Sequence, residues 1–538
     1  MTDLSAFKLP EIDPGAMPEF TDGASCKAWL ENVPLANVST AQHQLLMQVE
    51  EFNRTAAAPQ DRFEALEAAR EAVGFVQIEQ AKRFTHRALP MLEAEAAVFE
   101  DTIELWEQMR LGYLRCLEAH APSLRAQRAL ICQRALAYSG LRMFHHYRAY
   151  RQVPGRDWRA LHQLYAHAER LGIADAPVKD YLNRDVYGTS PRIAYLRAVL
   201  LGMCNANELG PRQLTFVAYL LERWADKVAI SKKPPKRESD VPPLTLDLGG
   251  EHCAERGAPA GDDIRYLDER RLAKSLRNRV ALLRKGESPA RLALGEDCVQ
   301  PSCEQLLVFL YRQWCQARAP RSAERARVMD VAQACTDIAA IHYYISGHAF
   351  RGARDFKELT ALQRDEITTF GRVTTRVEED FSAVQGFLLE HWQLEDESAQ
   401  GLKMVRRAGN PGKRMAHGQL VGVRPADGKN FQLGQVRWLM AGNAGDLHCG
   451  VKLLPGVPIA AAVRAIGVNV AEQRYVQAFA LAAVPALNAP PSLVTAAGWY
   501  KPKRVIEAAI HRPLRVRLLE VVERGTDFER LSYEVLPD

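Results

Sequence analysis

Residues 420–454 read LVGVRPADGKNFQLGQVRWLMAGNAGDLHCGVKLL, and this stretch predicts short β-strands joined by tight turns. Asp427-Gly428 is a strong hairpin signal and follows the apolar run at 420–423. The last apolar residues of the stretch alternate with period two: Leu447, Cys449, Val451 and Leu453. We therefore interpret this region as a small antiparallel barrel.

Two short motifs precede these strands. Arg372 and Arg376 are spaced by four residues, and Asp396, Ser398 and Gly401 form an Asp-x-Ser-x-x-Gly pattern shortly afterwards. The planar guanidinium of arginine binds phosphate with two hydrogen bonds and matches the O6 and N7 acceptors of guanine. A carboxylate and a hydroxyl can serve the donors of a base, and a glycine permits close approach to the backbone. The motifs together predict a site for a phosphorylated nucleotide.

In this order, the two motifs resemble the ligand signature of PilZ domains, which bind the bacterial second messenger cyclic di-GMP. The segments Gly434-Gln435-Val436-Arg437-Trp438 and Gly450-Val451-Lys452-Leu453 are similar to the late strands of that small antiparallel barrel. The resemblance covers roughly residues 365–460. It implies that the ligand is cyclic di-GMP and that the five motif residues bind it.

The residues alone leave other interpretations open. The arginine pair can be a solvated pair balanced by the acidic run at 378–380, and residues 396–401 can form an ordinary turn. Further arginines follow at Arg406, Arg407 and Arg414. They can add phosphate contacts or form a solvated hairpin tip, and we favour the hairpin tip.

The rest of the chain divides by composition and periodicity. Spacing of three to four residues between apolar positions predicts helices, as in one stripe that contains Trp106, Met109, Tyr113, Cys116 and Leu117. The fold class that we predict is α+β multidomain, with an N-terminal antiparallel helical array for which a solenoid is one possible form. The expected regions are an extended lead-in at 1–40, a helical region at 41–230, a linker at 231–262, a second helical block at 263–355 with a buried helix near 328–344, the PilZ-like barrel at 356–460 and a C-terminal β-rich segment at 461–538.

Composition narrows the class of protein. The 538 residues are 47% hydrophobic and 25% charged, as in folded globular domains. A net charge of +5 is too small for its size to indicate nucleic acid or an anionic membrane as a partner. Neither a secretory signal nor an apolar span is evident, so we expect a cytoplasmic protein. The ten scattered cysteines predict reduced thiols rather than a disulfide framework.

No motif of a nucleotide hydrolase, metalloprotease, serine hydrolase or cyclic di-GMP synthase is present. We therefore expect no catalytic residue, no metal and no cofactor, and a chain that is not an enzyme. Its layout is similar to that of FimW-type receptors, and the resemblance implies a cyclic di-GMP effector that acts in type IV pilus assembly and surface attachment. The protein partner would bind the helical region. The alternative is a helical scaffold whose barrel is degenerate and binds no nucleotide.

Overall fold

The computed structural model divides into two compact units, which we describe separately. The first unit contains Met1–Arg87 and Met91–Pro320, and the second contains Ala88–Pro90 and Arg321–Asp538. The structure describes residues 7–537 except for positions 8, 86, 183–187, 236–241, 258–260, 296–297, 300–301, 317–325, 351, 353–385, 399, 443–444 and 467–473.

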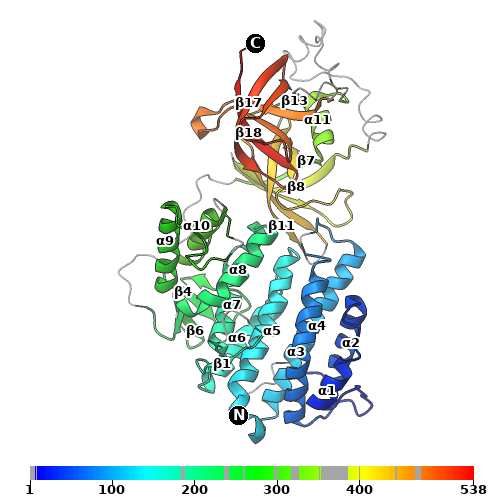
Figure 1. Ribbon diagram of the computed structural model, residues 1–538, viewed down its shortest axis with the longest axis vertical. Helices are drawn as coiled ribbons and strands as arrows, with labels where there is room; N and C mark the ends of the chain where they lie inside the picture. The colour runs from blue at the N-terminus through cyan, green and yellow to red at the C-terminus, as the bar shows by residue number, and fades with distance from the viewer. Residues whose placement is uncertain are drawn as a thin grey trace. The chain divides into compact units, whose positions relative to one another are not determined.

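The first unit is mainly helical (Figure 1). Its α-helices are α1 (Gly23–Leu30), α2 (Val38–Asn53), α3 (Pro59–Ala81), α4 (Glu93–Glu118), α5 (Arg128–Arg148), α6 (Gly155–Arg170), α7 (Pro191–Met203), α8 (Pro211–Trp224), α9 (Arg270–Arg284) and α10 (Ser302–Cys315). Proline is the first residue of α3, α7 and α8, where its missing N–H costs nothing and its fixed φ suits the helix. The short strands β1 (Val178–Lys179) and β2 (Gly188–Thr189) form a hairpin between α6 and α7.

The predicted apolar stripe on α4 is buried, which confirms its assignment to the core. Met109 and Tyr113 have no exposed surface, and Trp106, Cys116 and Leu117 are at most 4% exposed. Helix α4 packs against α2, α3 and α5, and the large core of the unit continues from there to α10. The fold is therefore the predicted α+β arrangement, with its helices in the N-terminal part.

Three details of the first unit and its boundary differ from our expectations. The stretch 231–262 contains parts of a four-stranded sheet with order β3-β6-β4-β5 rather than only a linker. These strands are β3 (Ala229–Ser231), β4 (Leu244–Asp247), β5 (Glu255–Arg256) and β6 (Ile264–Asp268). The buried helix predicted near 328–344 is wrong in its first half, because strand β7 (Ala326–Thr336) occupies it. Cys298 and Cys303 form a disulfide, so the prediction of reduced thiols is wrong for this pair.

The second unit begins with a closed antiparallel barrel in the order β10-β11-β12-β9-β8-β7. Its strands are β7 (Ala326–Thr336), β8 (Glu390–Ser398), β9 (Gly401–Arg406), β10 (Leu420–Arg424), β11 (Gln432–Ala441) and β12 (Leu447–Leu453). The predicted hairpin around Asp427-Gly428 joins β10 to β11, and Trp438 pairs with Gly450 on β12. A Cβ atom at Gly450 would lie 1.9 Å from the Trp438 indole nitrogen, which explains the glycine.

The C-terminal segment forms a second closed barrel, in the order β13-β14-β15-β18-β17-β16. Its strands are β13 (Pro458–Ala465), β14 (Val476–Leu481), β15 (Ser492–Ala496), β16 (Val505–Ala509), β17 (Pro513–Arg524) and β18 (Phe528–Val535). All neighbouring strands are antiparallel, and pairing of β13 with β16 closes the ring.

Helix α11 (Ile338–Ser346) and a shared core join the two barrels. Ile341 packs with Leu433 of the first barrel and with Phe479 and Phe528 of the second. His342, which is 2% exposed, makes a 3.1 Å hydrogen bond from Nε2 to the Ala461 carbonyl. The barrels therefore share one hydrophobic cluster and are not linked only by the chain, while the second barrel has a further buried cluster of its own.

Candidate functional site

The β8–β9 hairpin brings Asp396, Ser398 and Gly401 together. Ser398 pairs with Gly401 across the hairpin, and its hydroxyl donates a 3.1 Å hydrogen bond to the Gly401 carbonyl. A Cβ atom at position 401 would lie 2.6 Å from the Val451 carbonyl oxygen, so the glycine permits close packing of β9 on β12. Two of the three residues thus have a structural role in addition to any role in binding.

The described part of the hairpin is acidic. Asp396 lies half-buried opposite Lys403, whose ammonium group forms a 2.6 Å ion pair with Glu395. The hydrogen bond from Lys403 is the main reason that the pKa of Glu395 is lowered. Burial, followed by the nearby charges of Asp427 and Asp330, raises the pKa of Glu397. A phosphate at this end of the barrel would consequently need positive charge from elsewhere.

An open cavity of about 300 Å³ lies on the outer face of β7, β8 and β9. Its lining residues are Asp330, Val331, His391, Trp392, Gln393, Val405, Arg407 and Asn410. Arg407 is held at its edge by a 2.7 Å ion pair with Asp446 and by hydrogen bonds of 3.1 and 2.8 Å to Gln393 Oε1. The backbone N–H of Ala408 and the Arg407 guanidinium lower the pKa of Asp446. Arg407 is therefore exposed but already has an acidic partner.

Arg406 is not at the surface, so neither of our interpretations of this residue is correct. Its side chain is 5% exposed and forms a 2.7 Å ion pair with Glu390, which is 1% exposed. The guanidinium also donates to the Lys413 carbonyl at 2.9 Å and lies 5.2 Å from the centre of the Trp392 ring. Arg406 therefore belongs to the core of the barrel. Arg414, in contrast, donates hydrogen bonds of 3.0 and 2.6 Å to the Ala88 carbonyl.

Sequence reasoning missed this buried cluster, although a signal for it exists. Arg406 continues the period-two series of Leu402 and Met404, and Glu390 precedes Trp392 and Leu394 in the same way. All six of these residues are buried. A charged residue in register with apolar neighbours indicates a buried ion pair when a second strand offers the opposite charge.

Arg372 and Arg376 lie outside the described residues. The length of chain between Arg376 and Glu390 allows a span of up to about 50 Å. Strand β8 is roughly 27 Å long, since each residue of a strand adds about 3.4 Å. Arg376 is therefore close enough in sequence to reach either the hairpin or the cavity.

Comparison with known proteins adds a second line of evidence. Residues 24–236 match the family model "Cyclic-di-GMP receptor FimW, N-terminal domain", and residues 461–536 match the "FimW C-terminal beta-barrel domain". The chain is similar to FimW at both ends. The cyclic-di-GMP receptor FimW of Pseudomonas aeruginosa is 23% identical over 519 residues, which cover 87% of this chain and 83% of that protein.

The two FimW matches relate differently to the structural units, because the first ends inside the helical unit and the second nearly coincides with a barrel. The first covers α1 to α8 of the helical unit, and the second covers the C-terminal barrel almost completely. Between them lies the first barrel with its motif hairpin. Within the described part of the chain, no cluster of three or more histidine, cysteine or carboxylate side chains is arranged to hold a metal ion, and no helix is long and apolar enough to cross a bilayer.

Proposed function

We propose that this chain is a receptor for cyclic di-GMP that binds its ligand on the first barrel. The observation that carries the proposal is the β8–β9 hairpin, which gathers Asp396, Ser398 and Gly401 at one end of that barrel. The similarity to a FimW protein named as a cyclic-di-GMP receptor supports the same ligand. The role is one of binding and not of catalysis.

Each motif residue has a distinct part in the proposed complex. Arg372 and Arg376 bind the phosphates and the guanine edges, because the described end of the barrel is acidic and offers the phosphates little positive charge. The Asp396 carboxylate accepts hydrogen bonds from the N–H groups of a guanine. The Ser398 hydroxyl already donates to the Gly401 carbonyl, so its oxygen is left to accept a hydrogen bond from the ligand.

The cavity beside Arg407 supplies a second surface for the ligand. Its volume of about 300 Å³ is at the lower end of the range for small-molecule sites, so it fits one base better than a whole dinucleotide. Gln393 lies on β8 about 10 Å from Asp396, since the two are three positions apart along the strand. A ligand held by both groups would lie along β8.

The output of the receptor is the part of the proposal that rests on resemblance alone. Binding of the ligand through Arg372 and Arg376 alters the barrel, and this change is passed to a protein partner of the helical region. The family resemblance points to type IV pilus assembly and surface attachment as the process. The protein would act in the cytoplasm, as we expect from its sequence.

Calorimetric titration with cyclic di-GMP tests the proposal, with GTP and cyclic di-AMP as control ligands. The double variant Arg372→Ala/Arg376→Ala should lose at least about 100-fold in affinity, or about 2.7 kcal/mol, because it removes charge-assisted hydrogen bonds. Arg512→Ala/Arg515→Ala is the matched control, since both residues are exposed in the second barrel. No heat and no thermal shift with wild-type protein at saturating ligand would favour the alternative, a helical scaffold with a degenerate barrel.

Substitutions on the barrel locate the site. Ser398→Ala and Asp396→Asn should each weaken binding by about 10-fold, because each removes one hydrogen-bonding group. Gly401 is unsuited to this test, since any side chain there would collide with the Val451 carbonyl and disturb the fold. Unchanged affinity in both variants, with loss in the arginine variant, would place the ligand away from the hairpin.

A further inference from the structure

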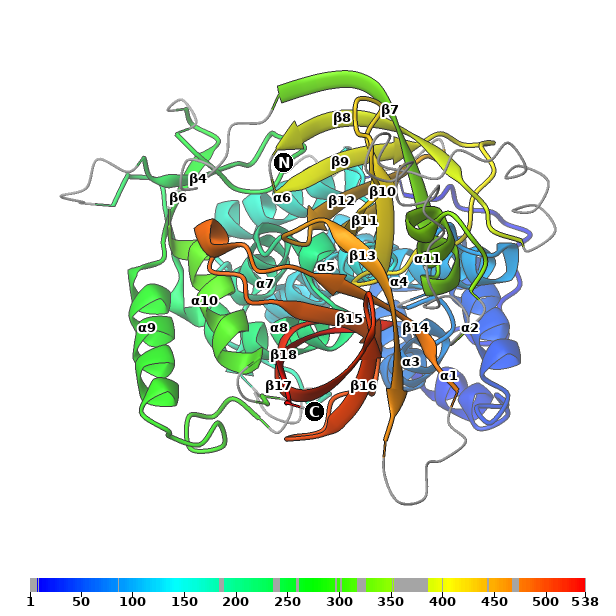
Figure 2. The same cartoon turned by 90° about the horizontal axis from the view of Figure 1, so that it is seen from above.

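Helix α9 has a composition unlike that of the other described helices. The stretch from Arg270 to Lys285 reads RRLAKSLRNRVALLRK, with seven basic residues and no acidic one. The net charge of +5 for the whole chain conceals this local excess. Both views of the ribbon place α9 at the periphery of the first unit, with α10 on its inner side (Figure 2).

The helix is divided into a buried apolar side and a basic solvent face. Leu272 and Leu276 have no exposed surface, and Leu283 is 6% exposed. The solvent face carries four exposed basic residues within an arc of about 120°, given 100° per residue, together with the exposed Asn278 and Ala281. These four residues, which we call the α9 basic face, are Arg271, Lys274, Arg277 and Lys285. They extend over roughly 21 Å of helix, at 1.5 Å per residue.

Within the described part of the chain, the charges of the α9 basic face lack the ionic partners that its neighbours have. Arg284 forms a 2.7 Å ion pair with Glu304, and Arg270 forms one of 2.5 Å with Asp268. Arg279 lies 4.7 Å from the centre of the Trp224 ring and donates to the Leu292 carbonyl. Among the described residues, the four members of the face have no ion pair. Such a surface attracts a partner with many negative charges.

We propose that the α9 basic face binds the surface of a membrane that contains anionic phospholipids. Adsorption of a polybasic segment to such a surface requires clustered charge and no apolar anchor. The leucines of α9 are buried against the protein, and Leu282 is only 39% exposed, so the helix has little apolar surface for insertion. A protein partner would normally use a desolvated apolar centre, which this face does not offer.

The composition of the face also favours lipid over single-stranded nucleic acid. Surfaces that bind single-stranded nucleic acid place aromatic side chains between the basic ones, and the α9 basic face contains none. A helix with four cations on one side can contact several headgroups of a plane at once. The proposed interaction does not depend on the ligand site of the first barrel, so it holds whether or not the chain binds cyclic di-GMP.

Vesicle co-sedimentation of the full-length protein tests this proposal. We expect binding to vesicles of phosphatidylcholine with about 40% phosphatidylserine at about 50 mM salt, and loss of binding at about 500 mM salt or without phosphatidylserine. The variant Arg271→Gln/Lys274→Gln/Arg277→Gln/Lys285→Gln should bind at least about tenfold more weakly. Glutamine is a good helix former, so an unchanged circular dichroism spectrum checks that the fold is kept.

A scattered variant with the same loss of charge is the control. Lys27→Gln/Lys501→Gln/Arg512→Gln/Arg515→Gln changes four exposed basic residues outside α9, and it should bind vesicles like the wild type. An equal loss in this control would overturn the proposal, because net charge would then explain the binding. Absence of wild-type binding would also overturn it. So would tighter binding to a DNA duplex that is lost in the α9 variant.

Discussion

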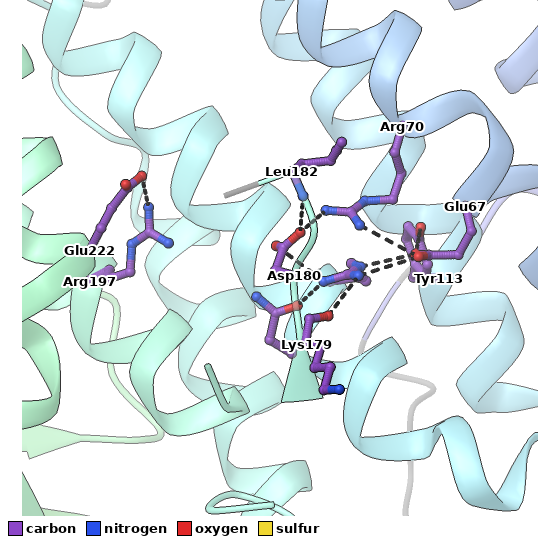
Figure 3. Close-up of polar contacts among 10 residues, drawn as sticks. Glu67, Arg70, Tyr113, Lys179, Asp180, Leu182, Arg197 and Glu222 are labelled. Atoms are coloured by element: carbon purple, nitrogen blue, oxygen red, sulfur yellow. Dashed lines mark hydrogen bonds and ion pairs between the residues drawn. The ribbon is translucent and has the colours of Figure 1, made fainter. Parts of the chain in front are cut away.

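The helical unit and the first barrel each bury an arginine, but they neutralise it differently. In the helical unit, Arg134 is 2% exposed and pairs with Glu67 at 3.0 Å and with Asp180 at 3.2 Å. Arg70 contacts the same two carboxylates, at 3.5 and 2.9 Å, and the Tyr113 hydroxyl donates to Glu67 at 2.6 Å (Figure 3). Two cations and two anions from α3, α5 and the β1–β2 loop therefore share the charge.

In the first barrel, Arg406 depends on a single carboxylate. Glu390 provides the ion pair at 2.7 Å and also accepts from the Lys413 backbone N–H and the Trp392 indole. No second acidic group among the described residues pairs with this arginine. The comparison teaches that a shared network tolerates the loss of one member, whereas an isolated buried pair leaves an uncompensated charge.

The largest loss of stability should follow from Glu390→Gln. It leaves the Arg406 charge buried without a partner, which should cost about 3–5 kcal/mol of stability in the second unit. Hydrogen exchange resolved by peptide can measure this loss separately for each unit. Glu534→Gln is the control, because its pair with Arg517 is 43–45% exposed and should contribute less than about 1 kcal/mol. A comparable loss in both variants would contradict the assignment of Arg406 to the core.

Arg134→Met should have a smaller effect, of about 2 kcal/mol. Arg70 still neutralises Glu67 and Asp180 in this variant, so no carboxylate is left without a cation. The same exchange measurement on α3 and α5 tests the expectation. A loss as large as that of Glu390→Gln would show that Arg70 does not substitute for Arg134.

Removal of both charges in the barrel should cost less than removal of one. Glu390→Gln/Arg406→Met leaves no buried charge, and we expect a loss of about 1–2 kcal/mol relative to the wild type. A double-mutant cycle with the two single variants gives the coupling energy. Strictly additive losses would mean that the two side chains do not interact in solution.

The smallest expected effect is the pH dependence of stability that comes from the ion pairs of Glu67 and Asp180 with Arg70 and Arg134. Burial raises the pKa of Glu67, but the hydrogen bond and charge of Arg134 outweigh it, and the pKa is lowered from 4.5. The pKa of Asp180 is likewise lowered from 3.8, by Arg70 and Arg134 against burial. Because the folded-state values are the lower ones, this stabilisation is complete above about pH 5 and is lost as the pH falls through them.

Comparison with Glu67→Gln/Asp180→Asn isolates this contribution. The difference in unfolding free energy from the wild type should be constant between about pH 5 and 7 and should shrink below about pH 4. A difference that grows on acidification would have the wrong sign for carboxylates with lowered pKa values.

Local signals predicted much of the fold. Asp427-Gly428 and the alternation from Leu447 to Leu453 identify β10 to β12, because a hairpin and its strands are encoded within a few residues. The stripe on α4 identifies a core helix in the same way. These elements could be predicted because their periodicity is fixed by neighbours in the sequence.

The remaining features depend on distant partners. Strand β7 pairs with β8 and β10, which follow it only after α11 and a long intervening segment. The local sequence of β7 is rich in alanine and predicts a helix, because the strands that pair with it are distant in the sequence. Closure of the second barrel likewise joins β13 to β16 and β15 to β18. In the candidate site, sequence identified the hairpin residues, whereas the burial of Arg406 depends on Glu390 from another strand.

The hydrophobic cluster shared by the two barrels means that neither barrel can be moved to another protein without exposing part of that cluster. Separation at the junction before Pro458 would expose Phe479 and Phe528 to water and remove the packing of α11 against β13 and β14. Recombination within a genome or in the laboratory should therefore preserve function only when it exchanges both barrels together. The tandem is in this sense one structural unit, although its strands close into two rings.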